Sequence, residues 1–408
     1  MRLDQGETVL KQPHPTNVDS IRVRAPAQTM PAGRVSRWIA YGYLVSVPFE
    51  IDLLVAGRSL SFWLALALIG VVIVELLAGS STRYSYSLNS RMLLSVLALL
   101  FYTCASYLWS VDQTATFISA MVFSLTVATW AAVAVSVSGR VLEAFQALLV
   151  GTSVMSVMAI NAEVNIDGRA ELTANVNDVA ALIAIVSAYL LSEILGRKKS
   201  LLRRLVFLGL LVLHLMAMLA TGSRTGILAV AASAVVLLIL HLMRARFAAL
   251  ATVLLLGVVL VNIAPALGVA IPERVAAIPA ALDSGELSNR EFYWQLAADE
   301  IPSVSGIGFG ATPSWMGVQS ATSGVIHSVY LGIALELGVI GVLLWIRFVW
   351  LVFQSARMSP QALALIPAAA AIAVMASTLT LEARRPLWVL LALMASHGIL
   401  KRKVCEIQ

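Results

Sequence analysis

Residues 325–350 read VIHSVYLGIALELGVIGVLLWIRFVW. The stretch begins with His327 and Ser328 and continues as an apolar run. A helix needs about 20 predominantly apolar residues to cross a bilayer, and this run supplies them. The run is continuous, whereas strands of a membrane barrel would alternate apolar and polar residues. The stretch therefore predicts a membrane-spanning helix with a polar, chemically reactive end.

The same pattern recurs along the chain, which has 408 residues, is 60% hydrophobic and 12% charged, and has a mean hydropathy of +0.89. Backbone groups inside lipid must be hydrogen-bonded within each span, so an all-α polytopic membrane protein is expected. About 12 transmembrane helices are predicted, at 38–56, 60–78, 92–109, 117–137, 141–161, 178–195, 204–221, 225–242, 247–264, 327–350, 361–379 and 385–400. The first is the weakest, because Pro48, Glu50 and Asp52 interrupt it.

Lysine and arginine set the expected orientation, because cytoplasmic segments carry an excess of them. With the N-terminus inside, 20 of the 28 fall on the cytoplasmic side and seven outside. The net charge of +6 thus reflects topology, and no nucleic-acid partner is expected. The predicted organisation is a disordered cytoplasmic tail (1–37), transmembrane helices 1–9 (38–264), a long outer loop between helices 9 and 10 (265–326), transmembrane helices 10–12 (327–400) and a cytoplasmic tail (401–408).

The outer loop is the longest polar interruption between the later spans. It holds six acidic residues and two basic ones, so Arg290 stands out as a specific contact and not as part of a basic patch. The glycine-rich residues 306–310 resemble a dinucleotide loop only superficially, since no strand and helix surround them. We interpret them as turns in a loop that covers a membrane-surface cleft like a lid.

Three residues on the outer side could carry chemistry. Arg224 lies at the outer start of the eighth span, where unpaired N–H groups and the helix dipole favour an anion. Arg290 lies in the loop, and His327 opens the tenth span, where the dipole favours a neutral imidazole that can act as a general base. The alternatives are an interfacial arginine that snorkels to water, a solvated loop charge and a polar interfacial histidine.

Together these residues suit an anionic lipid-linked substrate. The two arginines would hold a pyrophosphate leaving group and the histidine would deprotonate an acceptor hydroxyl. The sequence has no phosphate-binding loop of the G-x-x-x-x-G-K-[ST] type, no H-E-x-x-H and no cysteine pair with metal-binding spacing, so no metal or cofactor is expected.

Successive motifs resemble those of the O-antigen ligase and O-antigen polymerase superfamily. They are Asn175 to Ala180, Thr221-Gly222-Ser223-Arg224-Thr225-Gly226, Ser288-Asn289-Arg290 to Trp294, Gly306 to Gly310, and His327-Ser328-Val329-Tyr330-Leu331 through Glu336-Leu337-Gly338-Val339-Ile340-Gly341. One departure is Ser328, where the family often has Asn after the histidine.

The resemblance implies a metal-independent, inverting glycosyltransferase at the periplasmic face of the bacterial inner membrane. The donor would be a glycan on undecaprenyl pyrophosphate, and the acceptor another glycan or lipid A–core. By the resemblance, Arg224 and Arg290 bind the pyrophosphate and His327 is catalytic. The supporting candidates are Arg169, Ser223, Tyr330 and Trp294.

Two alternatives stay open at this point. Within the family, a ligase and a polymerase need the same leaving-group chemistry, so the motifs do not separate them. A transporter or flippase of lipid-linked oligosaccharide is the alternative from another class. Such proteins usually show internal repeats and charges near the midplane of the membrane. Here the polar residues gather on one side instead, which favours an enzyme.

Overall fold

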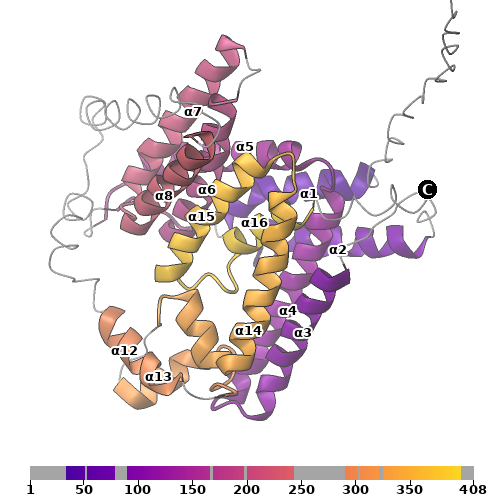
Figure 1. Ribbon diagram of the computed structural model, residues 1–408, viewed down its shortest axis with the longest axis vertical. Coiled ribbons are helices and arrows are strands. Elements are labelled where there is room, and N and C mark those ends of the chain that lie inside the picture. The colour runs from indigo at the N-terminus through magenta and orange to yellow at the C-terminus, as the bar shows by residue number, and fades with distance from the viewer. Residues whose placement is uncertain are drawn as a thin grey trace, which may run out of the picture. The chain divides into compact units, whose positions relative to one another are not determined.

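The computed structural model (Figure 1) describes residues 34–50, 53–78, 90–165, 169–196, 200–242, 290–301, 304–320 and 325–396. Its elements are α1 (Arg34–Ser46), η1 (Val47–Phe49), β1 (Leu54–Val55), β2 (Arg58–Ser59), α2 (Leu60–Leu77), α3 (Ser90–Ala105), η3 (Ser106–Leu108), α4 (Gln113–Ser136), α5 (Val141–Asn161), α6 (Val176–Ile194), α7 (Leu201–Ala220), α8 (Arg224–Leu242), α12 (Arg290–Glu300), α13 (Thr312–Ser320), α14 (Val329–Arg357), α15 (Ala362–Thr378) and α16 (Arg385–Ala395).

Within the described residues, eight helices are long and apolar enough to cross a membrane. They are α2, α3 extended by η3, and α4, α5, α6, α7, α8 and α14, and each overlaps a predicted span. The predicted polytopic helical architecture is therefore confirmed. The apolar helices α15 and α16 and the helix α1 are shorter than these eight. The predicted ninth span, 247–264, lies outside the described residues.

The first predicted span, 38–56, needs a correction. Helix α1 begins at Arg34 and ends at Ser46, and Pro48 follows in the short turn η1. Beyond it, β1 and β2 pair as an antiparallel hairpin whose exposed turn includes Gly57. Proline lacks the N–H that a continuing helix would need, so the helix ends before it.

Polar side chains set where several helices begin. A serine, aspartate or asparagine before the helix accepts a hydrogen bond from a backbone N–H of the first turn, which otherwise has no partner. These caps are Ser59 for α2, Asp112 for α4, Asn175 for α6, Ser200 for α7 and Ser328 for α14. Four of these five caps lie at predicted outer ends of helices, and Ser200 lies at a predicted inner end.

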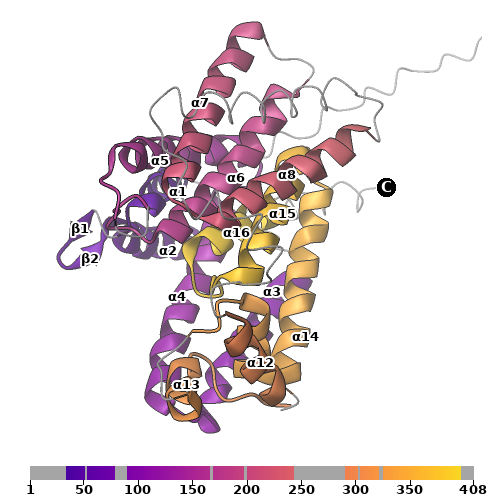
Figure 2. The same ribbon diagram turned by 90° about the vertical axis from the view of Figure 1, so that its left-hand side faces the viewer.

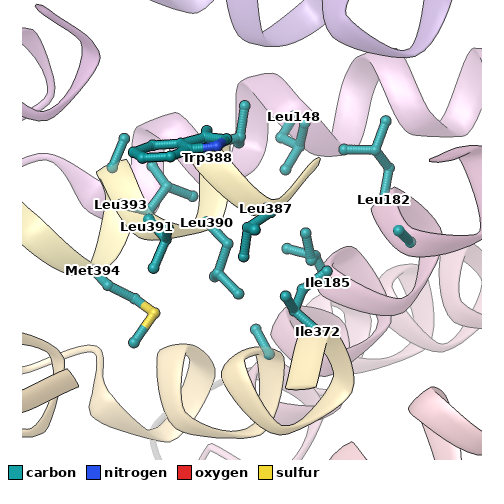
Figure 3. Packing of buried hydrophobic residues seen from close by; sticks show 14 of the residues in the cluster. Leu148, Leu182, Ile185, Ile372, Leu387, Trp388, Leu390, Leu391, Leu393 and Met394 are labelled. Carbon is teal, nitrogen blue, oxygen red and sulfur yellow. The ribbon is translucent and has the colours of Figure 1, made fainter. Parts of the chain in front are cut away.

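The core centres on α6 and α16. Helix α6 packs against α5, α7, α8 and α15, and 83% of its 18-residue apolar window is buried. The side chains of α16 from Leu387 to Met394 spread among Leu148, Leu182 and Ile372 of neighbouring helices (Figure 3). A Cβ at Gly151 of α5 would collide with the carbonyl of Val45, so a small residue allows α1 and α5 to approach closely.

Helix α14 contains a kink at Gly338. This residue has φ 62° and ψ −165°, a conformation that is essentially restricted to glycine. Residues 329–337 and 339–357 are therefore two helical segments that meet at an angle, where a single span over 327–350 was predicted. The helix begins at Val329, so His327 precedes it.

The outer loop contains two helices that the sequence did not predict, α12 and α13. Both contact α14 and lie beside it in Figures 1 and 2. A small cluster of buried side chains holds them there, including Ala297 of α12, Trp315 and Met316 of α13 and Leu335 of α14. The loop is thus a packed layer in its described part.

Candidate functional site

Arg224 lies where two helices begin next to each other. It is the first residue of α8, and α6 begins at Val176 nearby. The buried Ser223 links the two starts: its hydroxyl accepts a hydrogen bond from the N–H of Gly226 at 3.3 Å and donates to Asn177 Oδ1 at 3.4 Å. Adjacent helix N-termini present unpaired N–H groups and partial positive charge, and a half-buried guanidinium adds to them.

A third helix begins beside these two. Arg384, the residue before α16, places its guanidinium 3.6 Å from the carboxylate of Asp178, in the first turn of α6. Arg384 and Arg385 lie on the predicted outer side, and neither is among the predicted site residues. The available signal was a basic pair on the predicted outer side, where lysine and arginine are otherwise scarce.

Arg169 lies in the loop that covers the turn before Arg224. The N–H of Ala170 donates to the carbonyl of Ala220 at 2.8 Å, which fixes this loop to the end of α7. Asn165 accepts the Arg169 N–H at 3.0 Å. The loop borders an open hollow of about 350 Å³ lined by Arg169, Asn175 and Asn177, among others. Arg169 thus neighbours the asparagines at the start of α6.

His327 has an uncommon backbone conformation. Its φ is +50°, in the left-handed region that residues other than glycine rarely adopt. Ser328 then caps α14 by accepting the Leu331 N–H at 3.4 Å, so the serine that departs from the family pattern has a structural task. The imidazole is half-buried. Strained residues of this kind concentrate at functional sites, because the surrounding fold must hold them in place.

A hydrogen bond attaches helix α12 to the segment next to His327. The indole N–H of Trp294 donates to the carbonyl of Ile326 at 2.8 Å, directly before the histidine. Arg290 is the first residue of α12, one turn before Trp294. The structure therefore brings the helix that carries Arg290 to the segment that carries His327.

Helix α15 connects the Arg224 and His327 regions. The hydroxyl of Thr378 at its end donates to that of Thr225 in α8 at 2.9 Å. Tyr330, which is 47% exposed, donates to the carbonyl of Ala373 in α15 at 3.2 Å. Four of the seven predicted site residues, Ser223, Arg224, His327 and Tyr330, thus lie on elements that contact α15. A fifth, Trp294, contacts Ile326, which adjoins His327.

The glycine-rich residues 306–310 close the end of the first α14 segment. The N–H groups of Ile307 and Gly308 donate to the carbonyls of Leu335 and Glu336 at 3.0 and 2.9 Å. These carbonyls lie in the last turn before the kink at Gly338, where a helix end leaves carbonyls available to other donors. Gly306 has φ +73°, and a Cβ there would collide with the Glu336 carbonyl. These residues are therefore a fixed junction between loop and helix.

The junction also contacts the turn between α3 and α4. Trp109 donates to the carbonyl of Ser305 at 3.0 Å, and Ser314 of α13 donates to Asp112 at 2.5 Å. The Ala115 N–H and then the Ser314 hydroxyl hold the pKa of Asp112 below its usual value. The loop is thereby attached both to α14 and to the α3–α4 end.

Two carboxyl groups lie close together beneath this layer. Glu336 is buried and accepts the Thr312 hydroxyl at 2.7 Å. Glu382, between α15 and α16, is a half-buried residue whose Oε2 atom is buried. Burial, and then the charge of Glu336, raise the pKa of Glu382 to about 7, while Arg384 acts in the opposite direction. Glu382 therefore changes charge near neutral pH.

We expect Glu382→Gln to flatten the dependence of stability on pH. The folded protein keeps a proton on Glu382 that the unfolded chain releases near its ordinary pKa of 4.5. Stability from this group is therefore complete below about pH 4.5 and is lost as the pH rises through about 7. Thermal unfolding of both proteins in detergent at pH 5 to 8 measures this. If the melting temperatures of the two proteins changed with pH in the same way, the prediction would be contradicted.

In the described ranges, no three His, Cys, Asp or Glu side chains are grouped as a metal ion would require. The site combines the adjacent N-termini of α6 and α8 with Arg224, His327 in a turn of fixed conformation, and the helices α12 and α13 packed against α14. This combination can bind an anionic group and accept a proton from a hydroxyl.

One comparison with known proteins finds a family resemblance over about a third of the chain. Residues 209–346 match the family model described as O-antigen ligase. The matched range contains Arg224, Arg290, His327 and the kink at Gly338. No curated protein matches the chain. The predicted resemblance to the O-antigen ligase and polymerase superfamily is thereby confirmed over residues 209–346.

Proposed function

We propose that the protein is a membrane glycosyltransferase that moves a glycan from undecaprenyl pyrophosphate to an acceptor hydroxyl at the periplasmic face. The transfer would serve polymerisation of O-antigen or exopolysaccharide, or ligation to lipid A–core. Besides the family match, one structural observation carries this proposal. The N-termini of α6 and α8 lie next to each other at Arg224, and α15 contacts both α8 and the segment that follows His327.

The contacts of the described residues support a one-sided site. Residues predicted outside contact one another, as in Arg384 with Asp178 and Ser314 with Asp112. At the other side, Ser138 donates to the carbonyl of Ser396. These contacts support the sorting of helix ends that the lysine and arginine distribution predicts, in which the candidate residues belong to the outer side.

In the proposed reaction, the acceptor oxygen forms a bond to the anomeric carbon of the donor. The bond from that carbon to the phosphate oxygen breaks, undecaprenyl pyrophosphate leaves and the anomeric centre inverts. His327 takes the proton of the attacking hydroxyl. Arg224 and Arg290, with the helix N-termini, stabilise the charge on the departing pyrophosphate. Neither the removal of the proton nor the departure of the pyrophosphate needs a metal ion in this scheme.

We expect Arg224→Ala to lower glycan transfer at least ~100-fold, because preorganised donors at a developing charge contribute that much in enzymes. Arg224→Lys should recover only part of the rate, since an ammonium is a point charge without the planar fork. Transfer is measured with purified protein and lipid-linked oligosaccharide. The matched control is Arg357→Gln, an exposed arginine at the other end of α14, which should keep normal transfer.

The same reconstitution separates the alternatives. Longer lipid-linked glycan would identify a polymerase, and glycan attached to added lipid A–core would identify a ligase. Movement of intact lipid-linked oligosaccharide across the bilayer, without transfer, would establish the transporter alternative and overturn the proposed function.

A further inference from the structure

A cavity of about 480 Å³ lies between α2, α4 and α16. Small-molecule sites commonly measure about 300–1,000 Å³, so this volume suffices for part of a ligand. Neither Arg224 nor His327 lines the cavity. The proposed function assigns nothing to it.

The mouth of the cavity is cationic. Arg58, Arg384 and Arg385 line it together with a single carboxylate, Glu50. The three arginines lie at the predicted outer ends of helices, and Glu50 lies in the outer part of the first predicted span. Such a concentration of arginine on that side is unusual, and guanidinium groups match the oxygens of a phosphate.

Arg385 is held in position before any ligand arrives. Its guanidinium donates to the hydroxyls of Ser59 at 3.1 Å and Ser61, and lies 3.3 Å from Glu50. Arg58 stands over the ring of Phe62, with 5.8 Å between Cζ and the ring centroid. An anion would therefore meet an arranged pair of charges instead of flexible surface side chains.

The interior of the cavity is apolar. Trp130 and Trp388 form part of its lining, with ring centroids 6.5 Å apart. Thr126 and Thr129 also line it, but each donates its hydroxyl to a carbonyl of its own helix at 2.8 Å. Their hydrogen-bonding capacity is thus largely used within α4, and the indole N–H of Trp130 is a single buried donor without a hydrogen bond among the described residues of this lining. A sugar, which carries many hydroxyls, would be poorly matched here.

The lining changes from charged residues at the mouth of the cavity to apolar residues in its interior. From Arg385 at the mouth to Ala392 in the interior is seven residues of α16, or about 10 Å along a helix axis. Val133 of α4 and Ala65 of α2 also face this interior. Positive charge at the membrane surface above an apolar slot is the arrangement that a phosphate headgroup with a hydrocarbon chain requires.

We propose that this cavity binds a phosphate-bearing lipid of the outer leaflet, with its headgroup at Arg58, Arg384 and Arg385 and a hydrocarbon chain between α2, α4 and α16. Two lipids share this chemistry. One is an anionic membrane phospholipid, and the other, resting on the proposed function, is the lipid-anchored acceptor. The donor pyrophosphate remains at Arg224.

Native mass spectrometry of the purified full chain tests the binding. Phosphatidylglycerol and uncharged diacylglycerol are the probes. The wild type should retain phosphatidylglycerol in preference, and the double variant Arg58→Gln with Arg384→Gln should bind it about tenfold more weakly. Leu125→Trp, which fills the cavity from α4, should weaken binding of both probes.

Two matched controls keep this test specific. Arg357→Gln removes an exposed arginine at the other end of the spans, and Ile118→Trp adds the same bulk at a position on α4 that is 57% exposed and outside the cavity. Both should retain phosphatidylglycerol as the wild type does. Equal retention by all variants, or equal loss in variants and controls, would overturn the proposal.

Competition identifies the source of the lipid. If added acceptor lipid displaces phosphatidylglycerol, the cavity is the acceptor site; if it does not, the cavity holds membrane phospholipid. Arginine-dependent retention without any glycan transfer would keep this proposal and defeat the proposed function. Glycan transfer by the wild type, together with unchanged phosphatidylglycerol retention in the double variant, would support the proposed function and overturn the lipid-binding proposal.

Discussion

His327→Asn is expected to lower glycan transfer by about 10²- to 10⁴-fold, the contribution of a general base. Asparagine lacks the basic imidazole. It is also the better test variant, because it tolerates the left-handed backbone that His327 adopts at φ +50°, whereas alanine would add backbone strain. Initial rates with lipid-linked oligosaccharide and acceptor measure the effect.

A second variant separates chemistry from conformation. His327→Ala removes the imidazole and strains the turn, so it should be as inactive as His327→Asn and also less stable. If His327→Asn were fully active while His327→Ala was not, the histidine would serve the turn and not the reaction. Binding of the lipid-linked donor should remain in both variants, since Arg224 is unchanged.

Gly338→Ala is expected to destabilise the protein by about 3 kcal/mol and to abolish transfer. The kink residue has φ 62° and ψ −165°, and an added Cβ would collide with the carbonyl of Val304. The first α14 segment could then no longer meet the junction at Gly306 and Gly308. Thermal unfolding in detergent and proteolysis around α12 and α13 measure this loss.

Gly332→Ala is the matched control in the same helix. Gly332 lies in the first α14 segment, and a Cβ there would have no atom within 4 Å. Replacing a helical glycine with alanine favours the helix by roughly 0.5–1 kcal/mol, so stability should be equal or slightly higher. Equal midpoints and equal activity for both variants would show that the kink does not anchor the outer layer.

Local sequence patterns predicted the helices well where apolar runs were long and polar caps bounded them. The fifth predicted span, 141–161, coincides with α5. The first was partly wrong because Pro48 ends the helix early, and the tenth was divided by Gly338. A run of apolar residues shows that a segment belongs in lipid, but it does not reveal a kink whose cause is a contact with another segment.

The sequence predicted which residue types belong to the candidate site, but it did not predict which of them lie close together. Predicted helix starts and side-chain chemistry indicate Arg224 and His327, and α15 connects their regions. The carboxyl pair of Glu336 and Glu382 was not anticipated. Neither carboxylate carries a local signal, since their proximity depends on how α14 and the turn before α16 pack.

The sequence by itself determined the membrane class, most spans, the predicted sides and the residue types that suit a pyrophosphate and a hydroxyl. These follow from hydrophobicity, charge and helix ends, which act over a few residues. Only the tertiary structure decided which of these residues meet. Arg385 contacts Ser59 across 326 residues of chain, and Phe309 contacts Ser106 across 203. Such contacts depend on the packing of whole helices, which no local pattern encodes.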